Sequence, residues 1–403
     1  MESSTTSLTS PYRPSSMRRV VIIGSGIAGV EAALALAIAH PTAHVTMVSR
    51  ELDLSIVPDL VYTPFGIDPT LLRIPLQRAL ASHGVEFVVG IVRRIDVDSH
   101  EVELAAGRTL RYDSLVVATG AHAATPATNQ LRTIADGHRL YGELLPFSRP
   151  ELRRRSIMIT LTDATPWPAP AFELALLLDR WLTACGTRDR VDVVVAHPDR
   201  EPLSIFGPEA SDLLTDRAVA RRIELIECLV AGSADGMSAD LVIDMPALVA
   251  THLQGLPHLD PDGLHAVDDQ FAIAPDVFVI GDANTLRVKT GFAAAWQARR
   301  LALQLGARPE LLGSSIDGVS IDDVVYEMDL VDGTLVARFH AASRLRPPYI
   351  DRHVDAQIVQ RLPRKLAGTL IREYLLDDLD VDAGASVRAF QRLVAGEPEQ
   401  RLA

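Results

Sequence analysis

The segment Gly24-Ser-Gly-Ile-Ala-Gly29 constrains the fold of this chain more than any other feature of the sequence. It follows an apolar run at 19–23, which predicts a buried parallel strand, and precedes an Ala- and Leu-rich helix predicted over 30–39. In this context the first glycine allows a tight turn, the second lets the backbone approach a pyrophosphate, and the third lets helix and strand pack closely. With the strand predicted at 45–48, the segment forms a βαβ unit that binds a dinucleotide at the helix N-terminus.

The end of the second predicted strand carries the candidates for binding the ribose. It reads Met47-Val-Ser-Arg-Glu51, and the usual position of the acidic residue falls on Ser49. Glu51 comes two residues later but is close enough to reach the same hydroxyls. Both alternatives, Ser49 and Glu51, stay open, with Arg50 between them.

Two later motifs have the order expected around a bound dinucleotide. An apolar strand predicted at 112–120 ends in Ala118-Thr119-Gly120, whose small side chains let the chain pass close to the cofactor. A second apolar strand ends in Gly281-Asp282. Lys289-Thr290-Gly291 then opens a helix predicted over 292–305, whose positive N-terminal end could stabilise negative charge on a reduced cofactor.

Together these motifs resemble the sulfide:quinone oxidoreductase group of the pyridine nucleotide-disulfide oxidoreductase superfamily, which is related to flavocytochrome c sulfide dehydrogenase and type II NADH dehydrogenases. The resemblance covers roughly residues 18–310. It implies an α/β glutathione-reductase-type flavoprotein with two Rossmann-like dinucleotide-binding domains and one FAD. It also implies that Asp282 accepts a hydrogen bond from the ribityl chain, that the backbone of Val92 meets the adenine, and that loop 58–64 lies over the cofactor. The expected FAD contacts are Gly24, Gly26, Ile27, Ala28, Gly29, Ser49, Arg50, Glu51, Val92, Ala118, Thr119, Gly120, Gly281, Asp282, Thr290 and Gly291.

The chain is expected to divide into the parts that this fold requires. A Ser-, Thr- and Pro-rich start predicts a disordered tail, and the apolar run at 85–92 predicts a single strand. Asp332-Gly333 between two apolar runs predicts a hairpin near the end. The expected parts are a tail at 1–17, an FAD-binding domain at 18–150 and 266–320, a second dinucleotide-fold domain at 151–265, and a small α+β C-terminal region at 321–403.

Two departures from the family pattern concern the substrate. The group resembled oxidises sulfide with two redox cysteines beside the flavin, but the first region reads Thr165-Pro-Trp-Pro-Ala-Pro170, and no Cys follows Cys228. Cys185 and Cys228 lie in apolar contexts, where buried, unreactive thiols are expected. No glycine occurs between Gly142 and Gly186, so the second domain lacks the turn that a nicotinamide dinucleotide needs, and we predict that its NAD(P)H site is lost.

The candidate catalytic residues are Trp167, Glu173 and Lys289, which with Phe172 are expected to line the face of the flavin. Glu173 matches a glutamate that type II NADH dehydrogenases carry at the corresponding helix start. In an apolar cleft its pKa would be raised and it could shuttle protons. The alternative is that Glu173 complements the N-terminus of its own helix.

The leading hypothesis is an FAD-dependent oxidoreductase that passes electrons from an unidentified donor to a quinone or another acceptor. The alternatives are a dehydrogenase or oxidase of a biosynthetic pathway, an NAD(P)H:quinone reductase of the type II NADH dehydrogenase kind, and a flavin-binding protein without turnover. The net charge of -13 argues against a nucleic-acid partner, and no metal site is predicted. The two cysteines fit the cytoplasm, and the basic segment 361–376 is either a helix on the inner membrane surface or a capping helix. A homodimer stays open.

Overall fold

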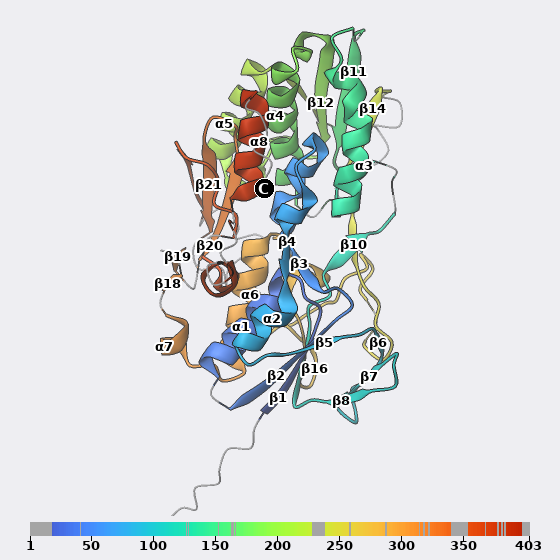
Figure 1. Cartoon of the computed structure of the whole chain (residues 1–403), viewed down its shortest axis with the longest axis vertical. Coiled ribbons are helices and arrows are strands. Elements are labelled where there is room, and N and C mark those ends of the chain that lie inside the picture. Colours follow the sequence, from blue (N-terminus) through green and yellow to red (C-terminus); the bar gives the residue numbers. More distant parts are fainter. Residues whose placement is uncertain are drawn as a thin grey trace, which may run out of the picture.

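The computed structural model describes residues 18–40, 42–125, 127, 129–151, 153–162, 165, 167–227, 238–257, 259–286, 288–313, 315–316, 319–320, 323–339, 354–366, 368–376, 379, 382 and 384–396. This part of the chain forms two α/β halves, one above the other in Figure 1, with the C-terminal strands and helix beside the upper half. Both halves contain a parallel sheet, which confirms the predicted α/β class.

The lower half is built on a six-stranded sheet in the order β16-β17-β9-β1-β2-β5. β1 pairs in parallel with both β2 and β9, and its last four residues are buried. Helices α1 and α6 pack against one face, and the small sheet β6-β7-β8 covers the other. The strands are β1 (Arg18–Ile23), β2 (Ala43–Ser49), β5 (Glu86–Val89), β6 (Val92–Asp96), β7 (Glu101–Leu104), β8 (Thr109–Arg111), β9 (Ser114–Val117), β16 (Ala272–Ala274) and β17 (Val277–Val279). The helices are α1 (Ile27–Ala39), α2 (Leu76–Ser82), α6 (Gly291–Gln304) and α7 (Pro309–Leu312).

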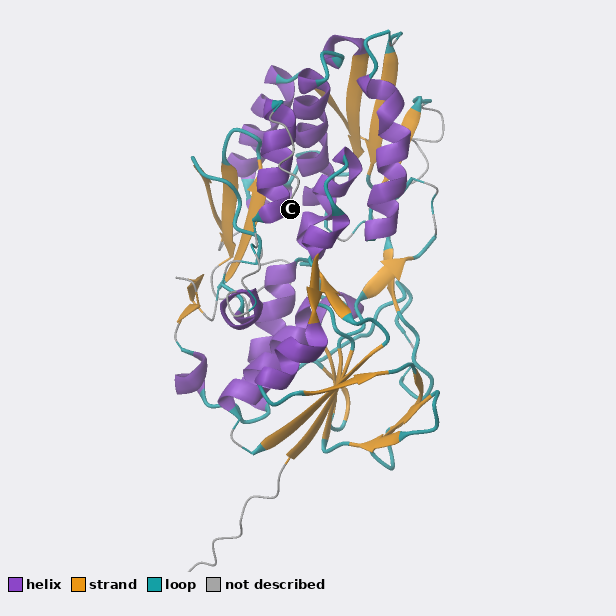
Figure 2. Cartoon of the chain, viewed as in Figure 1, coloured by secondary structure: helices purple, strands orange, loops and turns teal. Residues whose placement is uncertain are grey.

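The upper half is built on a four-stranded parallel sheet in the order β13-β12-β11-β14. Figure 2 shows helices beside these strands. The strands are β11 (Arg155–Thr160), β12 (Val191–His197), β13 (Ile223–Glu227) and β14 (Leu241–Asp244), and the helices are α3 (Ile134–Leu144), α4 (Ala169–Ala184) and α5 (Pro208–Ala220). The chain passes between the halves through β10 (Ala121–Ala123) and β15 (Leu248–Ala250), which pair with each other. The 3-10 helix η1 (Val57–Phe65) packs against α3, α4 and α8.

The C-terminal part joins both halves. β20 (Val324–Asp329), β21 (Thr334–Phe339) and β22 (Val354–Val359) form an antiparallel sheet, and α8 (Ala385–Ala395) packs against α4 and η1. The predicted hairpin at Asp332-Gly333 is therefore confirmed. Its turn is tied to α5, because Asp332 forms ion pairs with Arg217 and Arg221.

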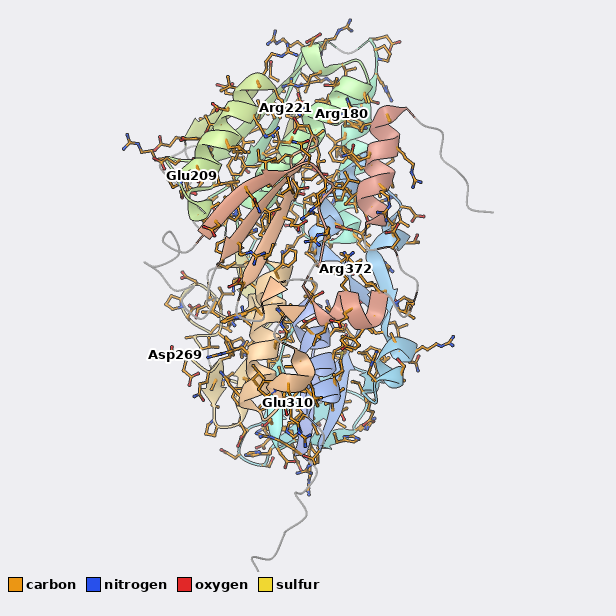
Figure 3. The ribbon with its side chains drawn as sticks, turned by 90° about the vertical axis from the view of Figure 1, so that its left-hand side faces the viewer. Arg180, Glu209, Arg221, Asp269, Glu310 and Arg372 are labelled. Carbon is orange, nitrogen blue, oxygen red and sulfur yellow. The ribbon has the colours of Figure 1, made fainter. Side chains whose placement is uncertain are left out.

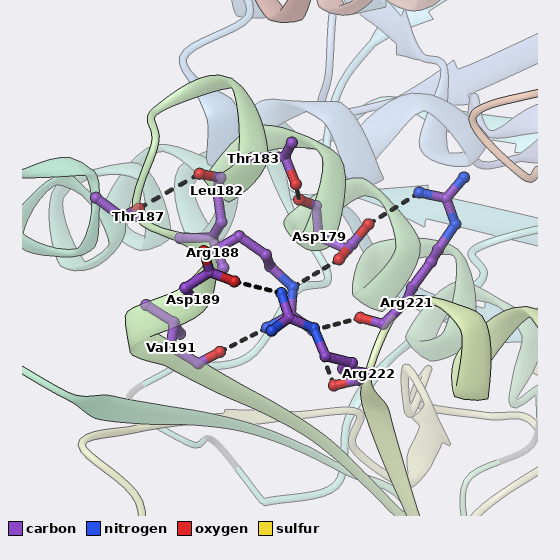
Figure 4. Close-up of polar contacts among 9 residues, drawn as sticks. All are labelled: Asp179, Leu182, Thr183, Thr187, Arg188, Asp189, Val191, Arg221 and Arg222. Atoms are coloured by element: carbon purple, nitrogen blue, oxygen red, sulfur yellow. Dashed lines mark hydrogen bonds and ion pairs between the residues drawn. The ribbon is translucent and has the colours of Figure 1, made fainter.

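A buried arginine joins three elements of the upper half. The guanidinium of Arg188 donates to Asp179 of α4 at 2.6 Å and to the carbonyls of Val191, Arg221 and Arg222 (Figure 4). These partners come from the end of α4, the start of β12 and the end of α5. One side chain therefore satisfies the polar groups where these three elements meet.

Two expectations about elements were wrong. The single strand predicted at 85–92 is divided, since β5 ends at Val89 and β6 begins at Val92 in another sheet. Segment 361–376 is not an amphipathic helix. Its helical structure begins only at Leu370 and continues as the π-helix η10 (Arg372–Leu376). Its apolar residues Leu366, Leu370 and Ile371 are buried in the protein. Figure 3 shows Arg372 between the two halves.

Some expectations were not tested. The predicted domain boundaries stay predictions, and the predicted tail at 1–17 lies outside the described residues. Among the helices that the structure describes, none has both the length and the apolar composition needed to cross a membrane.

Candidate functional site

The three glycines of the turn after β1 differ in what surrounds them. Gly24 has a positive φ of 107°, and a Cβ there would lie 2.3 Å from the Ala118 carbonyl oxygen. A Cβ on Gly29 would lie 2.1 Å from the carbonyl oxygen of Gly24. A Cβ on Gly26 would meet nothing within 4 Å. Gly24 and Gly29 are thus required by the packing of the protein itself, whereas Gly26 borders open space.

That open space is a cavity of about 860 Å³. It begins at the glycine turn, passes the ends of β2 and β9, and reaches the start of α4 and the strand β20. Fifteen of the sixteen expected FAD contacts line it; Gly29, held inside the turn, is the exception. The three candidate catalytic residues Trp167, Glu173 and Lys289 line it as well. So do Val57, Pro58, Leu60 and Val61 of η1, the segment expected over the cofactor.

Ser49 and Glu51 take different positions at the end of β2. Ser49 is buried, and its Oγ lies 2.8 Å from Ser25 Oγ and accepts the backbone N–H of Glu51 at 3.0 Å. The Glu51 side chain is 67% exposed and pairs with Arg50. Ser49 therefore holds the wall of the cavity in shape, and the carboxylate of Glu51 lies at its rim.

The Gly281-Asp282 corner contains a partner that the sequence analysis missed. Arg132 donates from Nη2 to Asp282 Oδ2 at 2.9 Å and also lines the cavity. The backbone N–H of Gly281 donates to Gln297 Oε1 of α6 at 2.8 Å. No local motif marks Arg132, because 150 positions separate it from Asp282.

The start of α6 faces the same corner. Thr290 caps this helix by accepting the backbone N–H of Ala293 at 3.0 Å. The neighbouring Lys289 is buried, and its Nζ donates to the carbonyl of Asn284. Burial lowers the pKa of Lys289 to about 8, while the nearby Asp282 acts in the opposite direction. This corner combines a cation with the positive end of a helix, an arrangement that stabilises an anionic group.

The far end of the cavity has an aromatic wall. Trp167 packs edge-on against Phe206 and Tyr326, with ring centroids 5.3 Å apart in each pair. Trp167, Pro170 and Tyr326 line the cavity. Phe172 was expected there too, but its ring packs against His197 and does not line the cavity.

Glu173 lies in this wall as one half of a buried ion pair. Its Oε1 accepts from Lys365 Nζ at 2.8 Å and from the backbone N–H of Asp329 at 2.9 Å. Burial raises the pKa of Glu173, and the ammonium of Lys365 opposes that shift. The alternative role for Glu173 was wrong, since the first turn of α4 contains no acidic residue and Glu173 bonds to other segments. Lys365 lies in the segment predicted as a helix and was not recognised from the sequence.

The start of α4 offers little to a second dinucleotide. Pro168 precedes the helix, Pro170 stands in its first turn, and the N–H of Ala171 already bonds to the carbonyl of Pro168. The indole of Trp167 occupies the adjoining space. Proline has no N–H to give a phosphate.

No thiol lines the described wall of the cavity. Cys185 follows the end of α4 and is half-buried rather than buried as expected. Its partial burial still raises the pKa of the thiol, which disfavours the reactive thiolate. Cys228 lies outside the described residues.

Comparison with known proteins places the glycine turn in a family. The pyridine nucleotide-disulphide oxidoreductase family is matched over residues 18–159. This stretch of the chain is similar to members of that family. The finding confirms the resemblance to the superfamily that the motifs indicated.

Individual relatives match only parts of this chain, with identities of 37% and 25%. A NADH dehydrogenase-like protein of Mycobacterium tuberculosis is 37% identical over 118 residues, which span 28% of each chain. The sulfide-quinone reductase of Aquifex aeolicus is 25% identical over 221 residues, 51% of this chain and 49% of that one. This chain therefore matches only about a quarter to a half of the length of these two relatives. The solved structure of sulfide:quinone oxidoreductase from Aquifex aeolicus has a TM-score of 0.72 at 17% identity, covering 94% of this chain and 92% of the other. It establishes a shared fold.

Proposed function

We propose that this protein is an FAD-dependent oxidoreductase that passes electrons from an unidentified donor to a quinone or a similar acceptor. The observation that carries the proposal is one continuous cavity. It has the dinucleotide-binding turn at one end and the aromatic wall with the Glu173–Lys365 pair at the other. A cofactor that stretches between them needs both a pyrophosphate and a flat redox-active ring, as FAD has.

The residues of the cavity suit FAD along its length. Open backbone at Gly26 would admit the pyrophosphate at the start of α1, whose N-terminal end favours negative charge. Asp282 lies in the middle, where the resemblance places the ribityl chain, and Lys289 with the start of α6 lies beyond it. Bound FAD supplies reversible two-electron chemistry, and the protein supplies orientation and charge around it.

The wall at α4 and β20 favours a flat, uncharged acceptor. Trp167 and Tyr326 offer aromatic surface, and the ammonium and carboxylate of the Glu173–Lys365 pair already neutralise each other. A quinone head group combines an apolar ring with oxygens that accept hydrogen bonds. Lys365 is suited to donate to such an oxygen, and Glu173 to exchange a proton.

The test uses anaerobic protein whose FAD has been reduced with light and an amine donor. Mixing with a water-soluble quinone should reoxidise the flavin at least about a hundredfold faster than mixing with the same concentration of dioxygen, a barrier difference of about 2.7 kcal/mol. Glu173→Gln should slow the reaction with quinone, and Glu310→Gln, at an exposed position outside the cavity, should not. Faster reaction with dioxygen would favour the biosynthetic oxidase. Reoxidation by neither acceptor, with FAD still bound, would favour a flavin-binding protein without turnover.

A further inference from the structure

Behind the aromatic wall lies a set of titratable side chains that the proposed electron transfer does not use directly. We call Asp59, Tyr62, Glu173, Asp329 and Lys365 the buried acid cluster; each is at most 2% exposed. They come from η1, α4, β20 and the segment before η10, so four separate stretches of chain meet here. Glu173 and Lys365 reach the cavity, whereas Asp59 and Asp329 lie behind them.

Direct contacts link Tyr62, Glu173, Asp329 and Lys365 to one another, whereas Asp59 feels Lys365 and Glu173 only through their charges. Lys365 donates to Glu173 at 2.8 Å, and its ammonium lies 5.6 Å from the centre of the Tyr62 ring. The Tyr62 hydroxyl donates to Asp329 Oδ2 at 2.9 Å, and Asp329 Oδ1 accepts the N–H of Val331. Oδ1 of Asp59 is buried and has no hydrogen-bond partner among the described residues.

The charges of the cluster do not balance if every acid is ionised. Three carboxyl groups face one ammonium, and the nearby Glu327 already pairs with Arg361. Excess negative charge buried away from water is costly, so one carboxyl group of the cluster should bind and release a proton near neutral pH rather than at about pH 4. Asp59 is the member best placed to hold it, because Glu173 and Asp329 each accept hydrogen bonds that stabilise the ionised form.

The groups around Asp59 agree with this assignment. Lys365 and Glu173 are its charged neighbours, Tyr62 shares its element, and Ser386 of α8 is its hydroxyl neighbour. Helix α3 also packs against η1, where its Gly137 lies against Thr63 and its Tyr141 against Gly66. Burial raises the pKa of Asp59 to about 7, Glu173 acts in the same direction, and Lys365 and Ser386 oppose it.

We propose that Asp59 is a redox-linked proton store, which binds a proton when the FAD in the cavity is reduced and returns it when the acceptor is reduced. Asp59 does not line the cavity, so it acts through Glu173 and Lys365 rather than by touching the flavin. It is therefore a positioning residue, which stores a proton for the groups that line the cavity. The inference rests on the proposed function, because it assumes that FAD binds in this cavity.

Reduction brings two electrons from the donor and one proton to the flavin, which leaves one added negative charge in the cavity. That charge raises the proton affinity of the cluster behind the wall, and the ionised carboxylate of Asp59 takes a second proton from solvent. A quinone acceptor needs two electrons and two protons. Bound FAD would supply both electrons and one proton, and Asp59 would supply the other proton by way of its charged neighbours Lys365 and Glu173.

The experiment counts protons rather than turnover. FAD bound to the protein is reduced by light and an amine donor in weak buffer with a pH-indicator dye, so neither the natural donor nor the acceptor is needed. Oxidation of the amine releases the same number of protons in every sample, so the variants are compared with one another. Between about pH 7 and pH 8.5 the wild type should show a larger net proton uptake per FAD than Asp59→Asn, by up to about one proton. Asp68→Asn, the same change at an exposed residue that caps the 3-10 helix η2 (Pro69–Leu72), should behave as the wild type. Equal uptake by Asp59→Asn and the wild type would overturn the proposal.

A second measurement does not depend on the flavin. In protein stripped of FAD, Asp59→Asn should raise the melting temperature relative to the wild type at about pH 8 and leave it nearly unchanged at about pH 4, because only the wild type must then bury an ionised Asp59. Asp59→Leu, of similar volume, serves where the Asn variant does not accumulate. No gain at about pH 8 would overturn the proton store. Failure of the protein to bind FAD would overturn the proposed function instead, and the melting curves would still report on Asp59.

Discussion

At the scale of single residues, a side chain added at Gly26 should weaken FAD binding but not folding, whereas one added at Gly29 should weaken the fold itself. Gly26 has ordinary extended backbone and open space around it, so Gly26→Val should fold normally. Its branched side chain would occupy the space of the pyrophosphate, so affinity for FAD should fall at least tenfold, about 1.4 kcal/mol. Gly29→Ala should lower the melting temperature even without FAD, because its Cβ would strike the turn at Gly24. Flavin absorbance and melting curves of both variants separate the two effects. A yellow Gly26→Val protein with unchanged affinity would show that the dinucleotide does not lie at this turn.

The residues that the sequence identified and those that it missed differ in one physical respect. Gly24, Gly26, Asp282 and Thr290 belong to short motifs whose meaning follows from neighbours in the chain. Arg132, Asp59 and Lys365 acquire their roles only from partners brought close by folding. The local sequence pattern carries no information on such pairings. The basic residues of segment 361–376 favoured a surface helix, but Lys365 points inward and pairs with Glu173.

At the scale of elements, the start of α4 predicts that NADH and NADPH do not reduce the flavin. Hydride transfer requires the nicotinamide to stack on the flavin, and the distant pyrophosphate and adenosine normally supply the binding energy that orients it. Here prolines and Trp167 replace the glycine turn that would bind them. Anaerobic stopped-flow mixing with about 1 mM NADH, near the upper end of usual KM values, should leave the flavin absorbance unchanged over seconds. Dithionite should bleach the same sample. Rapid bleaching by NADH would make NAD(P)H:quinone reduction the leading function.

At the scale of elements, sequence reasoning also succeeded for helices, strands and turns whose structure depends mainly on their own residues. The periodicity of apolar residues predicts the parallel strands and the helices that follow Gly24–Gly29 and Gly291. The turn-forming pair Asp332-Gly333 predicts the hairpin. The predicted strand at 85–92 failed because its two halves are equally apolar, and only tertiary pairing assigns them to different sheets.

At the scale of the whole molecule, the C-terminal segment joins elements that are distant in the chain. Glu31 of α1 accepts hydrogen bonds from Arg299 of α6 and from the backbone N–H groups of Leu370 and Ile371. Arg299 also donates to the carbonyl of Gly368. The cofactor half and the chain end are therefore held together by one buried ion pair, and both its side chains are at most 4% exposed.

Removing one partner of this pair should weaken the entire fold. Arg299→Met would leave Glu31 buried without its cation, at a cost of about 3–5 kcal/mol in the free energy of unfolding. Burial already raises the pKa of Glu31, and Arg299 opposes that shift, so the variant should raise it further. When folding raises the pKa of a carboxyl group, its contribution to stability is present at low pH. That contribution is lost as the pH rises through the pKa of the group in the folded state. The deficit of Arg299→Met should therefore be larger at about pH 8 than at about pH 5 in urea unfolding, and Glu31→Gln in the same chain should remove that difference. Arg154→Met, which breaks the exposed pair with Asp192, is the matched control and should change stability little at either pH. A deficit of Arg299→Met that does not depend on pH would show that lost packing, rather than the unpaired carboxylate, destabilises the molecule.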